Sequence, residues 1–202
     1  MESIIFTSLK NSISYEEYHK LFSKYVAEGK TSGQFQNEDL IHYTKLNWSR
    51  SERISKKLEL ENVIQDKIKL ISKPLVFLII TEMWCGDAAQ VVPVIGKIAQ
   101  QNPLVETRVV FRNENPDLMA NFLTNGAKSI PKIIIIESDS HTVLANWGPR
   151  PTAVQQMVLD YKKMTEKPPF TEFVTAVQSW YNKDKGLAIQ KEFIESIDKV
   201  FK

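Results

Sequence analysis

The middle of the chain carries the clearest pattern, because runs of apolar residues alternate there with segments of helical spacing. Residues 74–81 form an unbroken apolar run rich in Leu, Val and Ile, which is typical of a strand buried on both faces. Helical spacing follows at 88–101, then a strand pattern at 105–111, a short helix at 116–125 and two further strands at 132–137 and 142–147. This order predicts an α/β fold with a mixed sheet and an antiparallel hairpin at one edge.

Both ends of the chain have helical patterns. Apolar residues recur at three- and four-residue steps over 15–25, with Ser14 as the expected N-cap, and a second helix is expected over 37–60. After the sheet, Pro151 suits a first helical turn, and further helices are expected from Phe170 onward and over 187–201. We therefore expect a helical N-terminal segment packing on the core (1–72), a central α/β domain (73–165) and C-terminal helices (166–202).

Composition narrows the class of protein. The 202 residues are 43% hydrophobic and 25% charged, which is ordinary for a soluble globular chain. The formal charge of +2 gives no reason to expect nucleic-acid binding. The first residues lack a signal pattern and the longest apolar run is about a third of a membrane span, so we expect a cytoplasmic protein without membrane contact.

The strongest chemical candidate is the single cysteine, Cys85, which excludes an intrachain disulfide. It lies in the turn 82–87, between the buried strand and the helix that follows. Backbone N–H groups at a helix N-terminus favour a thiolate over a thiol. We therefore expect the pKa of Cys85 to lie below the free value of ~8.5, with Asp87 opposing this and its own charge satisfied by the same N–H donors.

Four features in order resemble the thioredoxin family. They are Trp84-Cys85-Gly86 after an apolar strand, Pro93 in the next helix, Ile130-Pro131 before a later strand, and Gly148 after the last strand. The resemblance covers roughly residues 70–165. It implies a thioredoxin-like mixed sheet flanked by helices, here with an N-terminal helical extension and extra C-terminal helices. It also implies a cis peptide bond between Ile130 and Pro131, with that segment pairing to an extended peptide.

The chain departs from the family at three positions. Ala88 replaces the second cysteine of the redox pair, Ile79 replaces the buried acid that assists proton transfer, and Asp87 replaces the usual proline. A mixed disulfide on Cys85 therefore has no internal thiol to resolve it. The chain is most similar to monothiol variants with a W-C-G-D motif. The glutathione-binding signature of monothiol glutaredoxins is not evident, so no cofactor is expected.

Two functions from different classes fit these residues. The first is monothiol thiol–disulfide exchange on a protein or small thiol or disulfide substrate, with Cys85 as the nucleophile. The second is a redox-inactive binding module that recognises an extended segment of a partner protein. The expected binding residues are Trp84, Gly86, Asp87, Ile130 and Pro131. The three histidines lie in separate segments without ligand spacing, so no metal site is expected, and the sequence assigns no oligomeric state.

Overall fold

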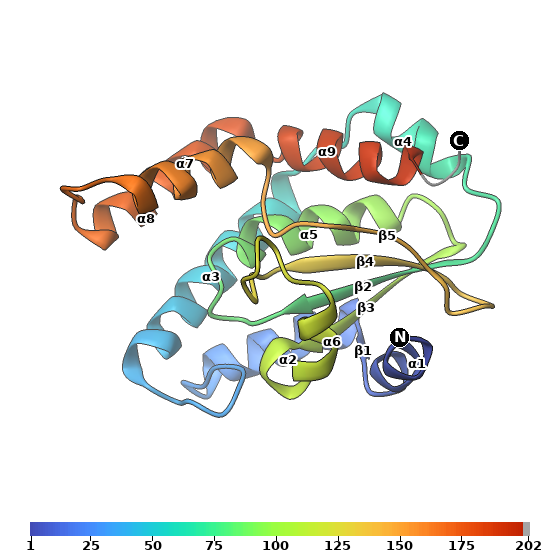
Figure 1. Cartoon of the computed structure of the whole chain (residues 1–202), viewed down its shortest axis with the longest axis horizontal. Coiled ribbons are helices and arrows are strands. Elements are labelled where there is room, and N and C mark those ends of the chain that lie inside the picture. Colours follow the sequence, from blue (N-terminus) through green and yellow to red (C-terminus); the bar gives the residue numbers. More distant parts are fainter. Residues whose placement is uncertain (200–202) are drawn as a thin grey trace.

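The structure, a computed structural model, describes residues 1–199 and is built on a five-stranded mixed sheet (Figure 1). The sheet order is β1-β3-β2-β4-β5, with β2 and β3 parallel and the other pairs antiparallel. The strands are β1 (Ile13–Ser14), β2 (Leu75–Thr81), β3 (Val105–Phe111), β4 (Lys132–Glu137) and β5 (Val143–Trp147). The predicted α/β class, with a hairpin of β4 and β5 at one edge, is confirmed.

Within the described residues the sheet is surrounded by nine α-helices. They are α1 (Glu2–Lys10), α2 (Tyr15–Ala27), α3 (Glu38–Lys57), α4 (Asn62–Lys69), α5 (Ala88–Ala99), α6 (Pro116–Asn121), α7 (Thr152–Lys163), α8 (Phe170–Asp184) and α9 (Leu187–Asp198). Helices α5 and α9 cover one face of the sheet, and α2 and α6 lie on the other (Figure 1). Helix α3 packs beside α5, while α7 and α8 extend from one end of the sheet.

Strand β2 occupies the centre of the sheet, and all seven of its residues are buried. It pairs with β3 on one side, as in Leu78 with Arg108, and with β4 on the other, as in Leu78 with Ile134. A strand covered by helices on both faces needs apolar side chains in both directions. This explains why the apolar run in the sequence is continuous rather than alternating.

The N-terminal segment is not wholly helical, which corrects the expectation for residues 1–72. The two-residue strand β1 joins the sheet edge, where Ile13 pairs with Val109. Such a strand is too short to leave a periodic pattern, and it depends on β3, almost a hundred residues later. Immediately after it, Ser14 caps α2 as expected, because its hydroxyl accepts the Glu17 N–H while the Glu17 carboxylate accepts the Ser14 N–H.

The C-terminal helix belongs to the same hydrophobic core as the sheet. Phe193 of α9 packs edge-to-face on Phe77 of β2 with ring centroids 5.1 Å apart, and both side chains are fully buried. Ile189 and Ile197 are also buried on this helix. The helix expected over 187–201 runs over Leu187–Asp198, and the last part of that expectation lies outside the described residues.

Candidate functional site

The candidate site lies in the turn at the carboxyl end of β2, where the chain enters α5. The Cys85 N–H donates to the Glu82 carbonyl oxygen (3.1 Å), and the Cys85 carbonyl oxygen accepts the Ala89 N–H (3.2 Å). Asp87 is the residue immediately before α5. In sheets of this kind ligands bind at the carboxyl ends of strands, so the turn has the position expected for a binding or reaction site.

The structure brings Cys85 together with the Ile130-Pro131 segment. The Cys85 Sγ donates a hydrogen bond to the Ile130 carbonyl oxygen at 3.3 Å, and the Ile130–Pro131 peptide bond is cis. The Cys85 side chain and Ile130 are both buried, with 8% and 4% of their surface exposed. The Cys85 thiol therefore forms its hydrogen bond with the Ile130 carbonyl group, which belongs to the segment expected to pair with a peptide.

The expectation of an acidic thiol is wrong. Burial, with a smaller contribution from the negative charge of Asp87, raises the pKa of the Cys85 thiol to about 12. The backbone N–H groups of Ala88 and Asp87 act in the opposite direction, as the helix N-terminus predicts, but their effect is smaller. Desolvation wins because the thiol faces the protein interior instead of the solvent at the end of the helix.

Asp87 is held by partners that are distant in the sequence. The Arg150 guanidinium donates to Asp87 Oδ2 from Nη2 (2.7 Å) and Nε (2.9 Å), and the Tyr181 hydroxyl donates to Asp87 Oδ1 (2.8 Å). Its side chain caps no N–H group of α5, contrary to the expectation that those donors would satisfy it. Burial raises the pKa of the Asp87 carboxyl, and Arg150 and Tyr181 partly offset this effect.

Gly86 is covered by side chains from α8 and α3. The Gln178 Nε2 donates to the Gly86 carbonyl oxygen (3.3 Å), and Gln178 in turn accepts a hydrogen bond from Gln90 (2.7 Å). A Cβ added at Gly86 would lie 3.3 Å from Gln178 Nε2 and 3.8 Å from Arg50 Nη1. Side chains of α3 and α8 therefore lie over the turn that holds Cys85.

Trp84 faces a different environment from its neighbour Cys85. The Arg112 guanidinium lies over the Trp84 ring, 5.0 Å from its centroid. Both residues line a pocket of about 500 Å³ whose other walls include Phe35 and Lys128. Phe35 leaves 70% of its surface exposed, so this pocket presents two aromatic rings and two cations to solvent.

Glu82 lies in the same turn but was not among the residues expected at the site. Its side chain is fully buried, accepts the Asn113 N–H (2.9 Å) and is hydrogen-bonded to the Ser32 hydroxyl. Burial raises the pKa of the Glu82 carboxyl. The Ser32 hydroxyl also accepts the Met83 N–H (2.9 Å). Glu82 therefore fastens the loop before α3 to the turn, and the only signal in the sequence is an acid directly after a buried strand.

The described residues contain no group of three or more histidine, cysteine or acidic side chains placed to hold a metal ion. His19 instead contacts Glu52 at 2.7 Å between α2 and α3. Over the same part of the chain, no helix has the length and apolar character needed to cross a membrane.

Comparison with known proteins gives a family match and two structural matches. A family model described as thioredoxin matches residues 33–166. The crystal structure of a protein of unknown function from Pseudomonas aeruginosa is similar over 93% of this chain and 98% of that one, with 17% identity and a TM-score of 0.59. The crystal structure of an HIV epitope-scaffold is similar over 93% and 99%, with 16% identity and a TM-score of 0.57. No curated protein matches the chain. At these identities the two structures show a shared fold, which extends beyond the residues of the family match.

Proposed function

The chain belongs to the thioredoxin family, and on that premise we propose that it is a redox-inactive member that binds an extended segment of a partner protein beside Trp84. The observation that carries this proposal is the state of Cys85. Its thiol is buried, hydrogen-bonded to the Ile130 carbonyl oxygen, and has a pKa raised to about 12.

A thiol in this state is a poor nucleophile at neutral pH, because the thiolate is the species that attacks a disulfide. With a pKa of about 12, only about one thiol in 100,000 is ionised at pH 7. The chain also lacks a second cysteine at Ala88. These facts favour the binding function over thiol–disulfide exchange.

The pocket beside Trp84 supplies the chemistry for recognition. Its aromatic side chains, Trp84 and Phe35, offer apolar surface, and an exposed aromatic residue at the rim of a pocket is typical of a binding surface. Arg112 and Lys128 add positive charge. The partner segment that fits this pocket is an extended peptide with an apolar or aromatic side chain next to acidic ones.

One wall of this pocket is held firmly in place. The Gln36 side chain accepts the Thr31 N–H (3.0 Å) and donates to the carbonyl oxygens of Thr31 (2.8 Å) and Gly33 (3.0 Å). The loop is further fixed by the Ser32–Glu82 hydrogen bond. A preformed wall lowers the cost of ordering side chains when a ligand binds.

The test is a binding experiment with a library of fluorescent decapeptides that vary in acidic and aromatic content. We expect acidic peptides with one aromatic residue to bind, and Trp84→Ala and Arg112→Glu to weaken this binding about tenfold or more. Lys191→Glu, an exposed change on α9, which contributes no residue to this pocket, serves as the charge control. Cys85→Ser should bind as the wild type does. Failure of all acidic peptides, or equal binding by Arg112→Glu, contradicts the proposal.

One observation favours monothiol exchange as the second candidate function. The backbone N–H groups of Asp87 and Ala88 act on the Cys85 sulfur in the direction that stabilises a thiolate. In that function the Cys85 thiolate attacks one sulfur of a disulfide, forms a mixed disulfide and releases the other half as a thiolate. Incubation with 2-hydroxyethyl disulfide at pH 7.4, followed by intact-mass measurement, separates the two. Adduct formation within minutes supports exchange, and an unmodified mass after hours supports the binding module.

A further inference from the structure

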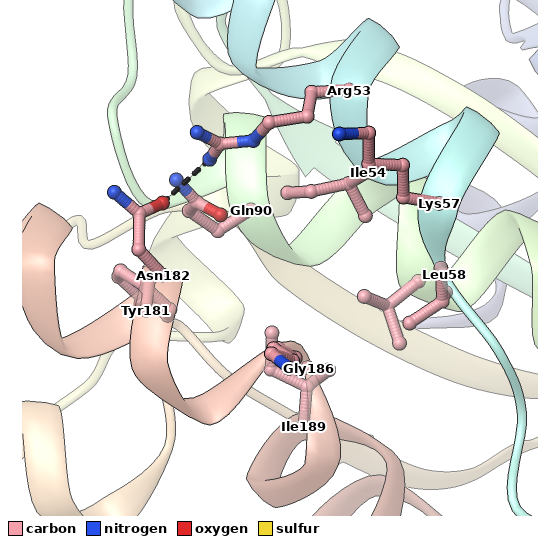
Figure 2. A pocket seen from close by; sticks show the side chains of 11 residues that line it. Arg53, Ile54, Lys57, Leu58, Gln90, Tyr181, Asn182, Gly186 and Ile189 are labelled. Atoms are coloured by element: carbon pink, nitrogen blue, oxygen red, sulfur yellow. Dashed lines mark hydrogen bonds between the residues drawn. The ribbon is translucent and has the colours of Figure 1, made fainter.

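A second pocket, of about 460 Å³, lies between α3, α5, α8 and α9 and shares no lining residue with the pocket beside Trp84 (Figure 2). Its volume is in the range of small-molecule sites. Its apolar lining includes Ile54 of α3, Leu58 directly after α3, Val94 of α5 and Ile189 of α9. A Cβ added at Gly186 would lie 3.2 Å from both Leu58 and Val94, so a side chain at position 186 would crowd this part of the lining.

The rim of this pocket carries three cations, Arg53, Lys57 and Lys185. Among residues 1–199 none of the three forms an ion pair. The Arg53 guanidinium donates to Asn182 Oδ1 (2.5 Å), which joins α3 to α8 across the mouth (Figure 2). That hydrogen bond fixes Arg53 at the opening without neutralising it.

Two of the acidic side chains nearest in sequence, Glu52 and Asp184, are engaged by other groups. Glu52 contacts His19 (2.7 Å) and Lys56 (2.9 Å), and the Asp184 carboxylate accepts the Ala188 N–H at 3.1 Å. Arg53 and Lys57 lie four residues apart on α3, and like charges at this spacing destabilise a helix. Within residues 1–199 no ion pair offsets the repulsion between these cations beside the apolar lining, and a bound anion would relieve it.

We propose that this pocket binds an organic phosphate monoester with an apolar or aromatic body. A phosphate dianion matches a group of three cations, and the guanidinium of Arg53 can donate two parallel hydrogen bonds to its oxygens. The apolar body fits among Ile54, Leu58 and Ile189. A purely apolar ligand would leave the cations unpaired, and a free anion would leave the apolar lining uncovered. A ligand with both an anionic and an apolar part matches the whole pocket.

The pocket adjoins the Cys85 turn through two of its walls. The Tyr181 side chain lines the pocket, and its hydroxyl donates to Asp87 (2.8 Å). Gln90 also lines it and donates to Gln178, which holds the Gly86 carbonyl oxygen. A ligand here contacts the same side chains that hold the turn.

The experiment is isothermal titration calorimetry at pH 7.5 with 1-naphthyl phosphate, 1-naphthol and inorganic phosphate. We expect 1-naphthyl phosphate to bind at least about tenfold more tightly than either fragment. Arg53→Gln/Lys57→Gln should weaken it about tenfold or more, whereas Lys45→Gln/Lys191→Gln, which removes two exposed charges outside the pocket, should not. The thermal unfolding midpoint of both double variants without ligand serves as the folding check.

Several outcomes overturn the proposal. These are absence of heat with 1-naphthyl phosphate, equal binding by 1-naphthol or by inorganic phosphate, and equal binding by the Arg53→Gln/Lys57→Gln variant. If that variant unfolds, Lys185→Gln, placed outside a helix, provides the same comparison with one charge removed. Because the peptide assay uses Trp84 and Arg112 instead, either proposal can fail while the other stands.

Discussion

The Asp87 carboxylate and the Arg150 guanidinium form an ion pair of 2.7 Å in which each side chain exposes only 15% of its surface. The pair joins the Cys85 turn to the segment between β5 and α7, sixty-three residues later. Because Arg150 lies outside α5, the conformation of the Cys85 turn depends on the segment after β5 as well as on α5.

Removal of one partner of this pair should destabilise the fold. Arg150→Gln leaves the buried Asp87 carboxylate without its countercharge, and an uncompensated buried charge costs on the order of 3 kcal/mol. Urea unfolding measures the loss. Glu16→Gln, which breaks the exposed pair with Lys20, is the control and should leave the midpoint unchanged. Equal midpoints for Arg150→Gln and the wild type would show that the pair contributes nothing.

Asp87 also controls the thiol, since its negative charge raises the pKa of Cys85. Asp87→Asn removes that charge and leaves Arg150 nearby, so the pKa of Cys85 should fall. The measurement is the rate of iodoacetamide alkylation against pH, taken under conditions where circular dichroism shows the variant folded. A midpoint that moves upward would mean that Asp87 supports the thiolate.

The raised pKa of Cys85 makes stability depend on pH in the alkaline range. The folded chain holds the thiol protonated to about pH 12, whereas the unfolded chain ionises near the ordinary value of 9.0. The stabilisation is therefore complete below pH 9 and is lost as the pH rises from 9 to 12, by about 2 kcal/mol between pH 8 and 10.5.

The control for this effect is Cys85→Ser, which keeps a donor for the Ile130 carbonyl oxygen but does not ionise in this range. The two proteins differ in no other ionisable group, so the difference between the two pH profiles reports the ionisation of Cys85 together with its effect on the nearby Tyr18 and Tyr181. Parallel profiles from pH 8 to 10.5 would contradict the raised pKa.

A second cysteine at position 88 should restore an internal disulfide. Ala88 is the first residue of α5, one turn from Cys85, at the family's spacing for a redox pair. Ala88→Cys should lose both free thiols on mild oxidation and gain weak insulin reductase activity, which the wild type should lack. Ala89→Cys places the new thiol one position further along the helix and should keep both thiols free. If both variants oxidise alike, the turn does not have the family's geometry.

A glycine is required at position 148, where the chain after β5 approaches Pro131. Gly148 has a φ of 106°, and an added Cβ would lie 2.5 Å from the Pro131 carbonyl oxygen. Gly148→Ala should therefore lower the free energy of unfolding by at least about 2 kcal/mol. Gly126→Ala has a φ of 75° with nothing within 4 Å of the added Cβ, so it measures the backbone strain without the clash. Equal losses in the two variants would show that the Pro131 contact is unimportant.

The sequence by itself determined four of the five strands of the sheet and the position of the Cys85 turn after β2. The strands expected at 105–111 and 132–137 have the same bounds in the structure, and the run at 74–81 contains β2. A strand buried on both faces needs an unbroken apolar run, and such a run can be recognised from consecutive residues. Ser14 capped its helix as expected because a capping box is satisfied within four residues.

Only the tertiary structure decided what surrounds Cys85. The sequence placed the thiol at a helix N-terminus, and that location does act to lower its pKa. The neighbouring residues Gly86 and Asp87, however, are held by Gln178 and Tyr181 of α8 and by Arg150, which lie 65 to 96 residues beyond Cys85 in the chain. Desolvation depends on every atom that excludes water from the thiol, so no local pattern can report it. The same reason explains why Glu82 was missed, since its partners are Ser32 and Asn113.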